Sequence, residues 1–285
     1  MAAAPASRIP AEGLFAPGSV SWHVDRESLV LAGGTCALLM QVAHPAVAAG
    51  VAAHSDFRAD PFARLRRTLG ASWAITFGDG QRAERAIRRI NAIHGAVRGV
   101  IPETGIPYSA LDPTLLLWVH ATLVDTALRI HDLFVAPLSA TQMNAYYREA
   151  APVAALLGVP DGLIPETLAD MRSWMAGLIA SGEVRVSPTA RSLASAILYP
   201  TRLPPRFVWD ASHLVSISVL PAELRRQYRI PWSARRARGV ERIASVTRQI
   251  VPWLPPALRY VPAARAAEAR FPRDYHGPAP APAPD

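Results

Sequence analysis

The sequence predicts an all-α protein: a single large helical domain with globin-like or bundle-like packing around a pocket. Apolar residues recur at helical spacing along most of the 285 residues, and 51% of the chain is hydrophobic, enough to bury a large core. Alternating strand patterns are rare, and the best of them, EVRVS at 183–187, is short. No motif repeats with a period of 20–50 residues, which argues against a solenoid.

The first elements are a leader and an uncharged apolar segment. Residues 1–20 are expected to be a loosely ordered leader. Residues 30–53 carry no charge and are long enough to cross a bilayer. A helix buried in the domain is favoured instead. We expect it to be interrupted at His44–Pro45, because proline disfavours the helical conformation of the residue before it.

Helical patterns follow one another along the rest of the chain. One runs from 61 to about Phe77, and the next opens at Asp79–Gly80 and closes at Gly99. Another has Asp112 as N-cap and Pro113 at its first position, a favoured pairing. Later helices are expected from Ser139, after Pro165, and over 187–198, about 203–229 and 232–251.

These patterns give the domain organisation. We expect one helical domain over residues 21–275, with 216–275 as a candidate C-terminal helical subdomain. The proline-rich end, residues 276–285, has the composition of an extended or disordered tail.

Charge and cysteine content exclude several classes of protein. All 30 basic residues are arginine and the net charge is +8, but the arginines are scattered and not interleaved with aromatic residues. We therefore expect no nucleic-acid partner, while a peripheral membrane contact stays open. Cys36 is the single cysteine, which excludes a disulfide framework and a zinc or iron–sulfur site and favours a buried, inert thiol. The N-terminus lacks the features of a signal peptide, so a cytoplasmic location is expected.

The first candidate site lies in the segment NAIHGAVRG. Asn91, His94 and Arg98 are spaced to share one helix face, beside an apolar stripe of Ile90, Ile93 and Val97. One interpretation is an ordinary core histidine with a hydrogen-bond partner. The other is a metal or haem ligand in an apolar wall, with the arginine near a carboxylate or propionate.

Two further groups are candidates on the same grounds. Arg64 and Thr68 lie one turn apart with Arg67 beside the threonine, either on a solvated basic face or partly directed inward. His120 lies in a strongly apolar helix, where a buried imidazole needs a partner. It could be structural, supporting or a ligand.

A non-haem iron site is a weaker alternative. His54 and Asp56 have the spacing of half of a two-histidine, one-carboxylate site. Two residues are weak support, and the Glu-x-x-His pattern of di-iron bundles does not occur.

The order of these blocks resembles the rubber oxygenase family, which includes latex-clearing proteins and mpaB-type oxygenases. The resemblance rests on LLMQVAHPAVAAGVAAHSDFRADPFARLRRTL, FGD, NAIHGAVRG, YSALDPTLLLWVHATLVD and YYREAAPVAALLGVP, and covers about residues 25–215. The resemblance implies a helical fold around a b-type haem pocket. It also implies cleavage of carbon–carbon double bonds of isoprenoid chains by dioxygen.

The resemblance also assigns roles to residues. His94 matches the proximal ligand of the haem iron, in a block that begins at Asn91 and ends at Arg98. Arg64 and Thr68 match a distal pair, and these residues with Arg67 are the catalytic candidates. His120 matches a further histidine close to the haem.

The chain departs from the family pattern in two places. Rubber oxygenases carry a lysine where Arg67 stands, and a guanidinium is a poor iron ligand, so a side chain capping the iron is put in doubt. Latex-clearing proteins are secreted, whereas this chain shows no signal peptide and is expected in the cytoplasm. This location disfavours polyisoprene as substrate. It favours a smaller, apolar, alkene-bearing substrate together with dioxygen. The alternatives are a non-catalytic haem-binding sensor or carrier and a membrane-associated helical protein without haem.

Overall fold

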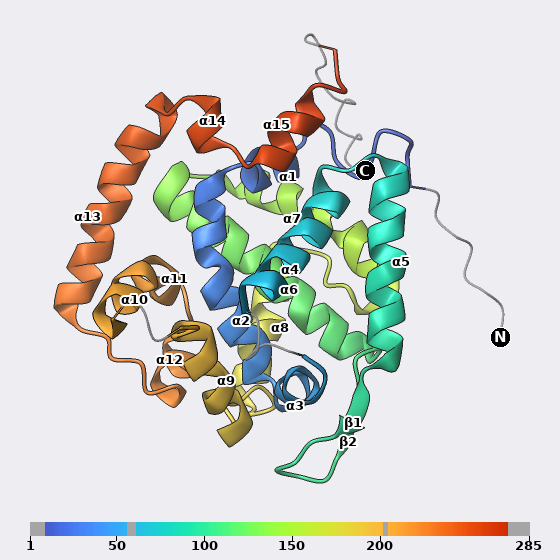
Figure 1. Cartoon of the computed structure of the whole chain (residues 1–285), viewed down its shortest axis with the longest axis vertical. Helices are drawn as coiled ribbons and strands as arrows, with labels where there is room; N and C mark the ends of the chain where they lie inside the picture. Colours follow the sequence, from blue (N-terminus) through green and yellow to red (C-terminus); the bar gives the residue numbers. More distant parts are fainter. Residues whose placement is uncertain (1–8, 56–60, 202–204, 273–285) are drawn as a thin grey trace.

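The structure, a computed structural model, describes residues 9–55, 61–201 and 205–272, with the backbone alone at 61–65 (Figure 1). It confirms the all-α prediction. The described part contains fifteen α-helices, four short 3-10 or π helices and one two-stranded hairpin.

The N-terminal half contains two central helices, and it ends in a short π-helical turn. Its elements in chain order are α1 (Val20–Asp25), η1 (Ser28–Gly33), α2 (Gly34–Ala43), α3 (Pro45–His54), α4 (Pro61–Thr76), α5 (Gly80–Ala96), β1 (Arg98–Val100), β2 (Pro107–Ser109), α6 (Pro113–Ile130) and η2 (His131–Val135).

The C-terminal half wraps around these helices. Its elements are α7 (Ala140–Leu156), η3 (Asp161–Leu163), α8 (Leu168–Ala180), α9 (Pro188–Leu198), α10 (Arg206–Ser212), α11 (Leu214–Ser218), α12 (Ala222–Gln227), α13 (Ala234–Ile250), η4 (Val251–Trp253), α14 (Pro256–Arg259) and α15 (Pro262–Glu268).

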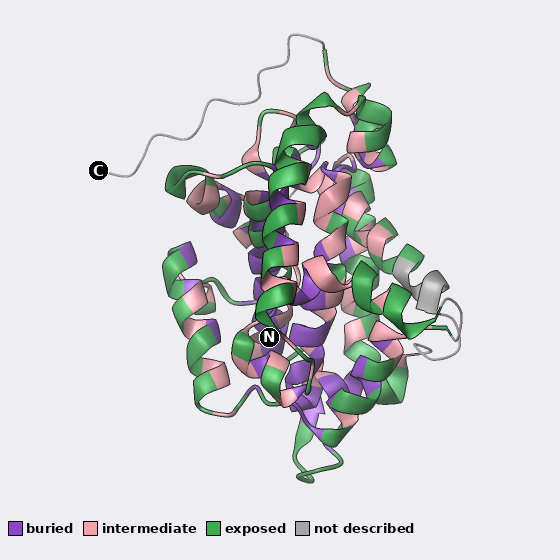
Figure 2. Ribbon diagram, turned by 90° about the vertical axis from the view of Figure 1, so that its left-hand side faces the viewer, coloured by how far each residue is buried: buried purple, intermediate pink, exposed green. Residues whose placement is uncertain are grey.

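Helices α2 and α6 form the centre of the main core. The Trp118 indole of α6 is fully buried and donates its Nε1–H to the Met40 carbonyl of α2 at 3.1 Å. Buried residues concentrate along these helices, whereas α13 and α5 form outer walls with exposed faces (Figures 1 and 2). Cys36 of α2 is also buried, and burial raises the pKa of its thiol to about 12, as expected for an inert cysteine.

The uncharged segment is broken at His44, as predicted. His44 has an extended backbone, and its Nδ1 accepts a hydrogen bond from the Ala46 amide at 3.2 Å, which caps the start of α3. Among the described residues no single helix is long and apolar enough to span a membrane. The pair 28–43 and 45–54 passes that test only when taken together, and it bends by 105°.

The His44 cap predicts a pH-dependent stability. Burial lowers the pKa of His44 to about 4, below its ordinary value of 6.5, so between these values the unfolded chain binds more protons than the folded one. Stability should therefore fall as the pH drops from about 6.5 to about 4, by roughly 2 to 3 kcal/mol from this residue. The His44→Asn variant keeps a capping oxygen and should lose that part of the slope in urea titrations at several pH values. An unchanged slope would contradict the assignment.

Gly33 allows η1 to pack closely against α6. A Cβ at this position would lie 2.6 Å from Thr126 Cγ2 and 2.8 Å from Ile130 Cγ1, both in buried side chains. The adjacent Gly34 has nothing within 4 Å of its added Cβ.

These neighbouring glycines make a matched pair of variants. Gly33→Ala should lower the free energy of unfolding by about 1 to 3 kcal/mol, because the added methyl group overpacks the contact with α6. Gly34→Ala should leave stability unchanged or raise it by up to about 1 kcal/mol. Urea denaturation of both variants tests this, and equal effects would refute the close contact.

Three expectations about elements were wrong. The helix expected over 80–99 ends at Ala96, where the chain enters the antiparallel pair β1–β2. The helix expected over about 203–229 is three short helices, because Pro205 and Pro221 occupy cap positions. Residues 183–187 form no strand. Val184 and Val186 alternate with exposed residues and are buried, but no neighbouring strand pairs with them.

The ends of the described chain pack onto the domain. Phe15, in the segment expected to be a loose leader, is buried in a small core with Trp22 and Phe77, whose rings meet edge to face at 5.0 Å. In the C-terminal segment 216–275, Leu224 and Val240 belong to the main core. The tail 276–285 lies outside the described residues.

A buried ion pair joins the two ends. Glu27, just before η1, is 2% exposed and receives hydrogen bonds from Arg259 Nε at 2.9 and 3.0 Å. A backbone bridge between Glu27 and Tyr260 accompanies this pair, and the Val261 amide donates to the Arg26 carbonyl at 2.8 Å. The loop before α15 is thereby fixed to the start of the chain.

Candidate functional site

Helix α5 carries the candidate residues at the end of its buried face. Asp79 caps the helix by accepting from the Arg82 amide at 2.8 Å, as the Asp-Gly start predicted. Buried positions then follow at Gly80, Ala83 and Ile87, and the half-buried residues 91 and 94 continue that face at helical spacing.

The apolar stripe predicted beside this face is only partly formed. Ile93 is 54% exposed, whereas Ile90 and Val97 are half-buried. Val97 packs into a small core with Ala46, Ile101 and others, at the base of the β1–β2 hairpin.

His94 is half-buried with an unused nitrogen. Its Nδ1 is buried and has no hydrogen-bond partner within the described part of the chain. Burial also lowers the pKa of His94, so the imidazole is neutral at pH 7. A neutral imidazole keeps a lone pair on one ring nitrogen, which is the form that ligates metals.

Asn91 fixes this end of α5 to α7. Its Nδ2 donates to the Leu156 carbonyl at 3.0 Å, close to the end of α7. Its Oδ1 is buried without a partner among the described residues. An unused acceptor and an unused imidazole nitrogen therefore lie one helical turn apart on α5.

His120 brings a second imidazole from α6. It is 8% exposed, its Nε2 has no described partner, and burial lowers its pKa to about 4. Leu116, one turn earlier, packs with Ala154 of α7 and with Val159. The end of α7 thus contacts both α5, through Asn91, and α6, through Leu116.

The three residues fit a cofactor supplied from outside the chain. Seven buried side-chain nitrogen or oxygen atoms lack a partner within the described residues, and three of them belong to Asn91, His94 and His120. Such atoms are rare in folded proteins, because each loses its hydrogen bonds to water without replacement. A haem fits this set, since its iron takes a neutral imidazole as axial ligand.

Arg98 is not on the face that the sequence predicted. Because α5 ends at Ala96, Arg98 lies in strand β1 and its side chain is exposed. Its carbonyl accepts from His54 Nε2 at 3.2 Å. The prediction that the helix continues from His94 to Arg98 is therefore wrong, because the β1–β2 hairpin begins at Arg98.

The non-haem iron alternative gains no support. His54 is exposed and engaged with the Arg98 carbonyl, and Asp56 lies outside the described residues. Among the described residues no group of three or more histidine, cysteine, aspartate or glutamate side chains could hold a metal ion.

The candidate distal residues lie on α4, which packs against α5 as a helical hairpin. Arg67 and Thr68 are exposed, and the side chain of Arg64 lies outside the described part. No described hydrogen bond joins Arg67 or Thr68 to His94 or His120. Their assignment as catalytic residues stays a prediction.

Sequence reasoning missed the partner of Asn91. The Leu156 carbonyl is 65 positions away along the chain, and no local pattern marks it. It also missed His44 as a helix cap, which Pro45 at the first helical position could have indicated.

Comparison with known proteins places the chain in a family. Residues 21–249 match the family model described as ER-bound oxygenase mpaB/B'/rubber oxygenase, catalytic domain. An uncharacterized protein of Mycobacterium bovis is 30% identical over 222 residues, which cover 74% of this chain and 84% of the relative. An uncharacterized protein of Mycobacterium tuberculosis matches with the same identity and coverage. No solved structure matches. The chain belongs to the mpaB/rubber oxygenase family and carries its oxygenase catalytic domain.

Proposed function

We propose that this protein is a haem b-dependent oxygenase that uses dioxygen to oxidise or cleave an apolar, alkene-bearing small molecule. The single observation that carries the proposal is the neutral imidazole of His94 on the buried face of α5, inside the matched oxygenase domain. Its buried Nδ1 has no partner within the described residues. When bound, the haem iron would supply activation of dioxygen.

The residues of α5 and α6 would hold and orient the cofactor. Neutral His94 would offer one ring nitrogen to the iron, and its other nitrogen, as N–H, would need an acceptor. Asn91 Oδ1 is an unused acceptor on the same face, held in place by the bond from Asn91 Nδ2 to Leu156. Hydrogen bonding to the second nitrogen is the usual way in which proteins fix the orientation of a ligating histidine. His120 would form part of the apolar wall.

The α4 residues would act on dioxygen. Arg64 and Thr68 would donate hydrogen bonds to dioxygen and stabilise negative charge that develops on it. Arg67, a permanent cation, would add to that field without binding iron. The proposal includes a cytoplasmic location and a substrate smaller than polyisoprene, such as a short isoprenoid.

The first test is the visible absorption spectrum of the protein expressed with a haem precursor, together with a pyridine haemochrome assay. An intense Soret band with about one haem per chain supports the cofactor. Oxygen uptake and carbonyl products with a short isoprenoid alkene then support the oxygenase reaction. A colourless, folded protein without iron would refute the haem site. Stoichiometric haem with slow autoxidation and no turnover would indicate a sensor or carrier instead.

Exposed apolar residues favour a peripheral membrane contact as an additional property. Trp253 is 86% exposed and Leu258 is 68% exposed, and both lie beyond α13, whose outer face carries Arg242 and Arg248. Exposed tryptophan and arginine side chains are typical of surfaces that contact anionic lipid. Flotation with vesicles containing phosphatidylserine tests this, and Trp253→Ser should reduce the bound fraction.

A further inference from the structure

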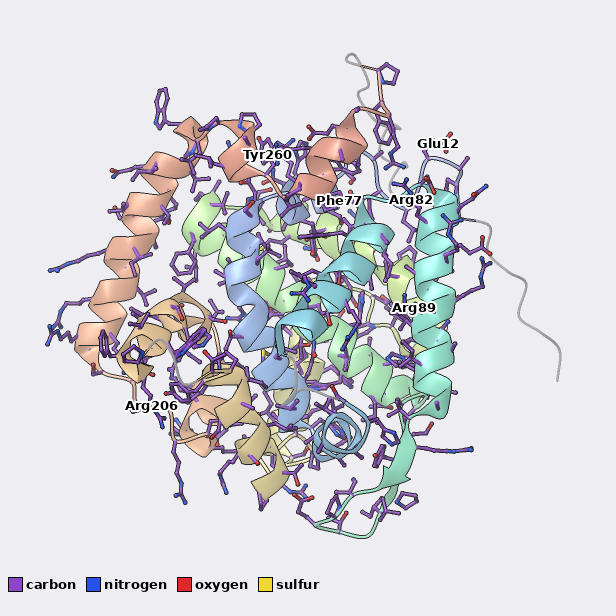
Figure 3. All side chains as sticks on the ribbon, viewed as in Figure 1. Glu12, Phe77, Arg82, Arg89, Arg206 and Tyr260 are labelled. Carbon is purple, nitrogen blue, oxygen red and sulfur yellow. The ribbon has the colours of Figure 1, made fainter. Side chains whose placement is uncertain are left out.

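A pocket lies on the other side of the core from α5. It has a volume of about 490 Å³ and lies between α9, α10, α11 and the segment that joins α12 to α13. Figure 3 shows Arg206, one of its lining residues, on the side of the molecule away from Arg89 of α5. The volume falls within the range of small-molecule sites, roughly 300 to 1,000 Å³.

The lining of this pocket is strongly cationic. Arg191, Arg206, Arg229 and Arg236 line it, against one carboxylate, Asp210. Asp210 already accepts a hydrogen bond from Tyr199 at 2.7 Å, and no ion pair joins it or any other described carboxylate to the four arginines. This excess of positive charge attracts anions to the pocket.

Three of these guanidinium groups are held in place, and one of them is Arg236, which donates from Nη1 to the Pro231 carbonyl. Arg206 stacks over the Tyr199 ring with its Cζ 3.9 Å from the centroid. Arg191 donates its Nε–H to the Gln227 carbonyl at 3.3 Å. Each contact leaves terminal N–H groups without a partner among the described residues, in the planar arrangement that binds carboxylate or phosphate with two hydrogen bonds.

Arg229 occupies a strained backbone position at the pocket. It is the one described non-glycine residue with a positive φ, 58°, and it follows the end of α12. The Ile230 amide closes that helix end on the Arg225 carbonyl at 3.0 Å, a geometry in which glycine is preferred. A side chain retained at such a position is a pointer to a functional contact.

The remaining lining is apolar and aromatic. Leu214, Ile217 and Trp232 line the pocket, and His213 adds no charge, since burial lowers its pKa. Trp209, stacked on His213 with ring centroids 6.0 Å apart, has a buried Nε1 without a partner in the described part of the chain. The pocket therefore has a cationic portion and an apolar portion.

We infer that this pocket binds a small amphiphilic anion, with a carboxylate or phosphate head on the arginines and an apolar body against Leu214, Ile217 and Trp232. The inference is independent of the haem proposal, because the pocket shares no residue with α4, α5 or α6.

Octanoate, octyl phosphate, octanol and inorganic phosphate are the probes, and calorimetric titration of the full chain is the measurement. Octanoate, octyl phosphate or both should bind, and should bind more weakly as salt rises. The head group that binds identifies which oxyanion the site takes. Octanol and inorganic phosphate should each bind at least about tenfold more weakly, since each lacks half of the recognised features.

Arg229→Gly is the diagnostic variant. Glycine relieves the backbone strain, so thermal stability should be unchanged or higher, while affinity for the bound anion should drop about tenfold. Arg235→Gln removes the same charge from an exposed neighbour that does not line the pocket, and should change affinity much less. Any of three results would overturn the inference. They are octanol binding as tightly as both anions, no binding by either anion, and an unchanged affinity in Arg229→Gly.

Discussion

Replacing His94 by alanine should abolish stoichiometric haem binding while leaving the fold intact. The imidazole is the one group on the buried face of α5 that can ligate iron, so its loss should remove the Soret band from the purified protein. The helix should tolerate the change well. The Nδ1 of His94 makes no described hydrogen bond, so replacing the side chain by alanine leaves no partner unsatisfied. The midpoint of thermal unfolding without haem should therefore stay the same or rise slightly.

The neighbouring residue supplies the control. Ile93 precedes His94 on the same helix but is 54% exposed, so Ile93→Ala should keep haem at about one per chain. Added imidazole should restore part of the haem binding in His94→Ala by occupying the vacated volume. An unchanged spectrum in His94→Ala would show that another residue ligates the iron, and His120→Ala would then be the next variant to measure.

Removing Arg259 should destabilise the protein by about 3 to 5 kcal/mol, because it leaves the Glu27 carboxylate buried without its partner. The Glu27 side chain is almost fully buried, and Arg259 donates hydrogen bonds to both of its carboxylate oxygens. Hydrogen bonding to Glu27 also raises the pKa of Arg259, so the arginine keeps its charge beside the carboxylate. Urea denaturation of Arg259→Ala measures the loss.

Two further variants separate the pair from general effects of the C-terminal segment. Arg265→Ala removes an exposed arginine from α15 and should cost less than about 0.5 kcal/mol. Adding Glu27→Gln to Arg259→Ala should recover part of the stability, because a neutral amide is less costly to bury than a carboxylate. If Arg259→Ala and Arg265→Ala destabilise equally, the buried pair does not hold the two ends together.

Local pattern was enough to predict most helices of this protein and to place Asn91 and His94 on one helix face. Caps at Asp79, Asp112 and Ser139 are local features, because a side chain two or three residues away satisfies the free amides of a helix start. The break at His44 is also local, since proline restricts the residue before it. The order of blocks from residue 25 to 215 predicted the family that residues 21–249 then matched.

Contacts between residues far apart in the sequence decided the rest. Helix α5 could have continued to Arg98. It ends earlier because strand β2 pairs with residues 98–100 and gives their backbone groups hydrogen-bond partners. Distant segments supply the Leu156 carbonyl that fixes Asn91, the arginine that pairs with Glu27 and the four arginines around the cationic pocket. The sequence by itself determined the all-α class and the position of most helices, because periodicity and capping act over a few residues. Only the tertiary structure decided which of those faces meet, because burial and pairing depend on the whole chain.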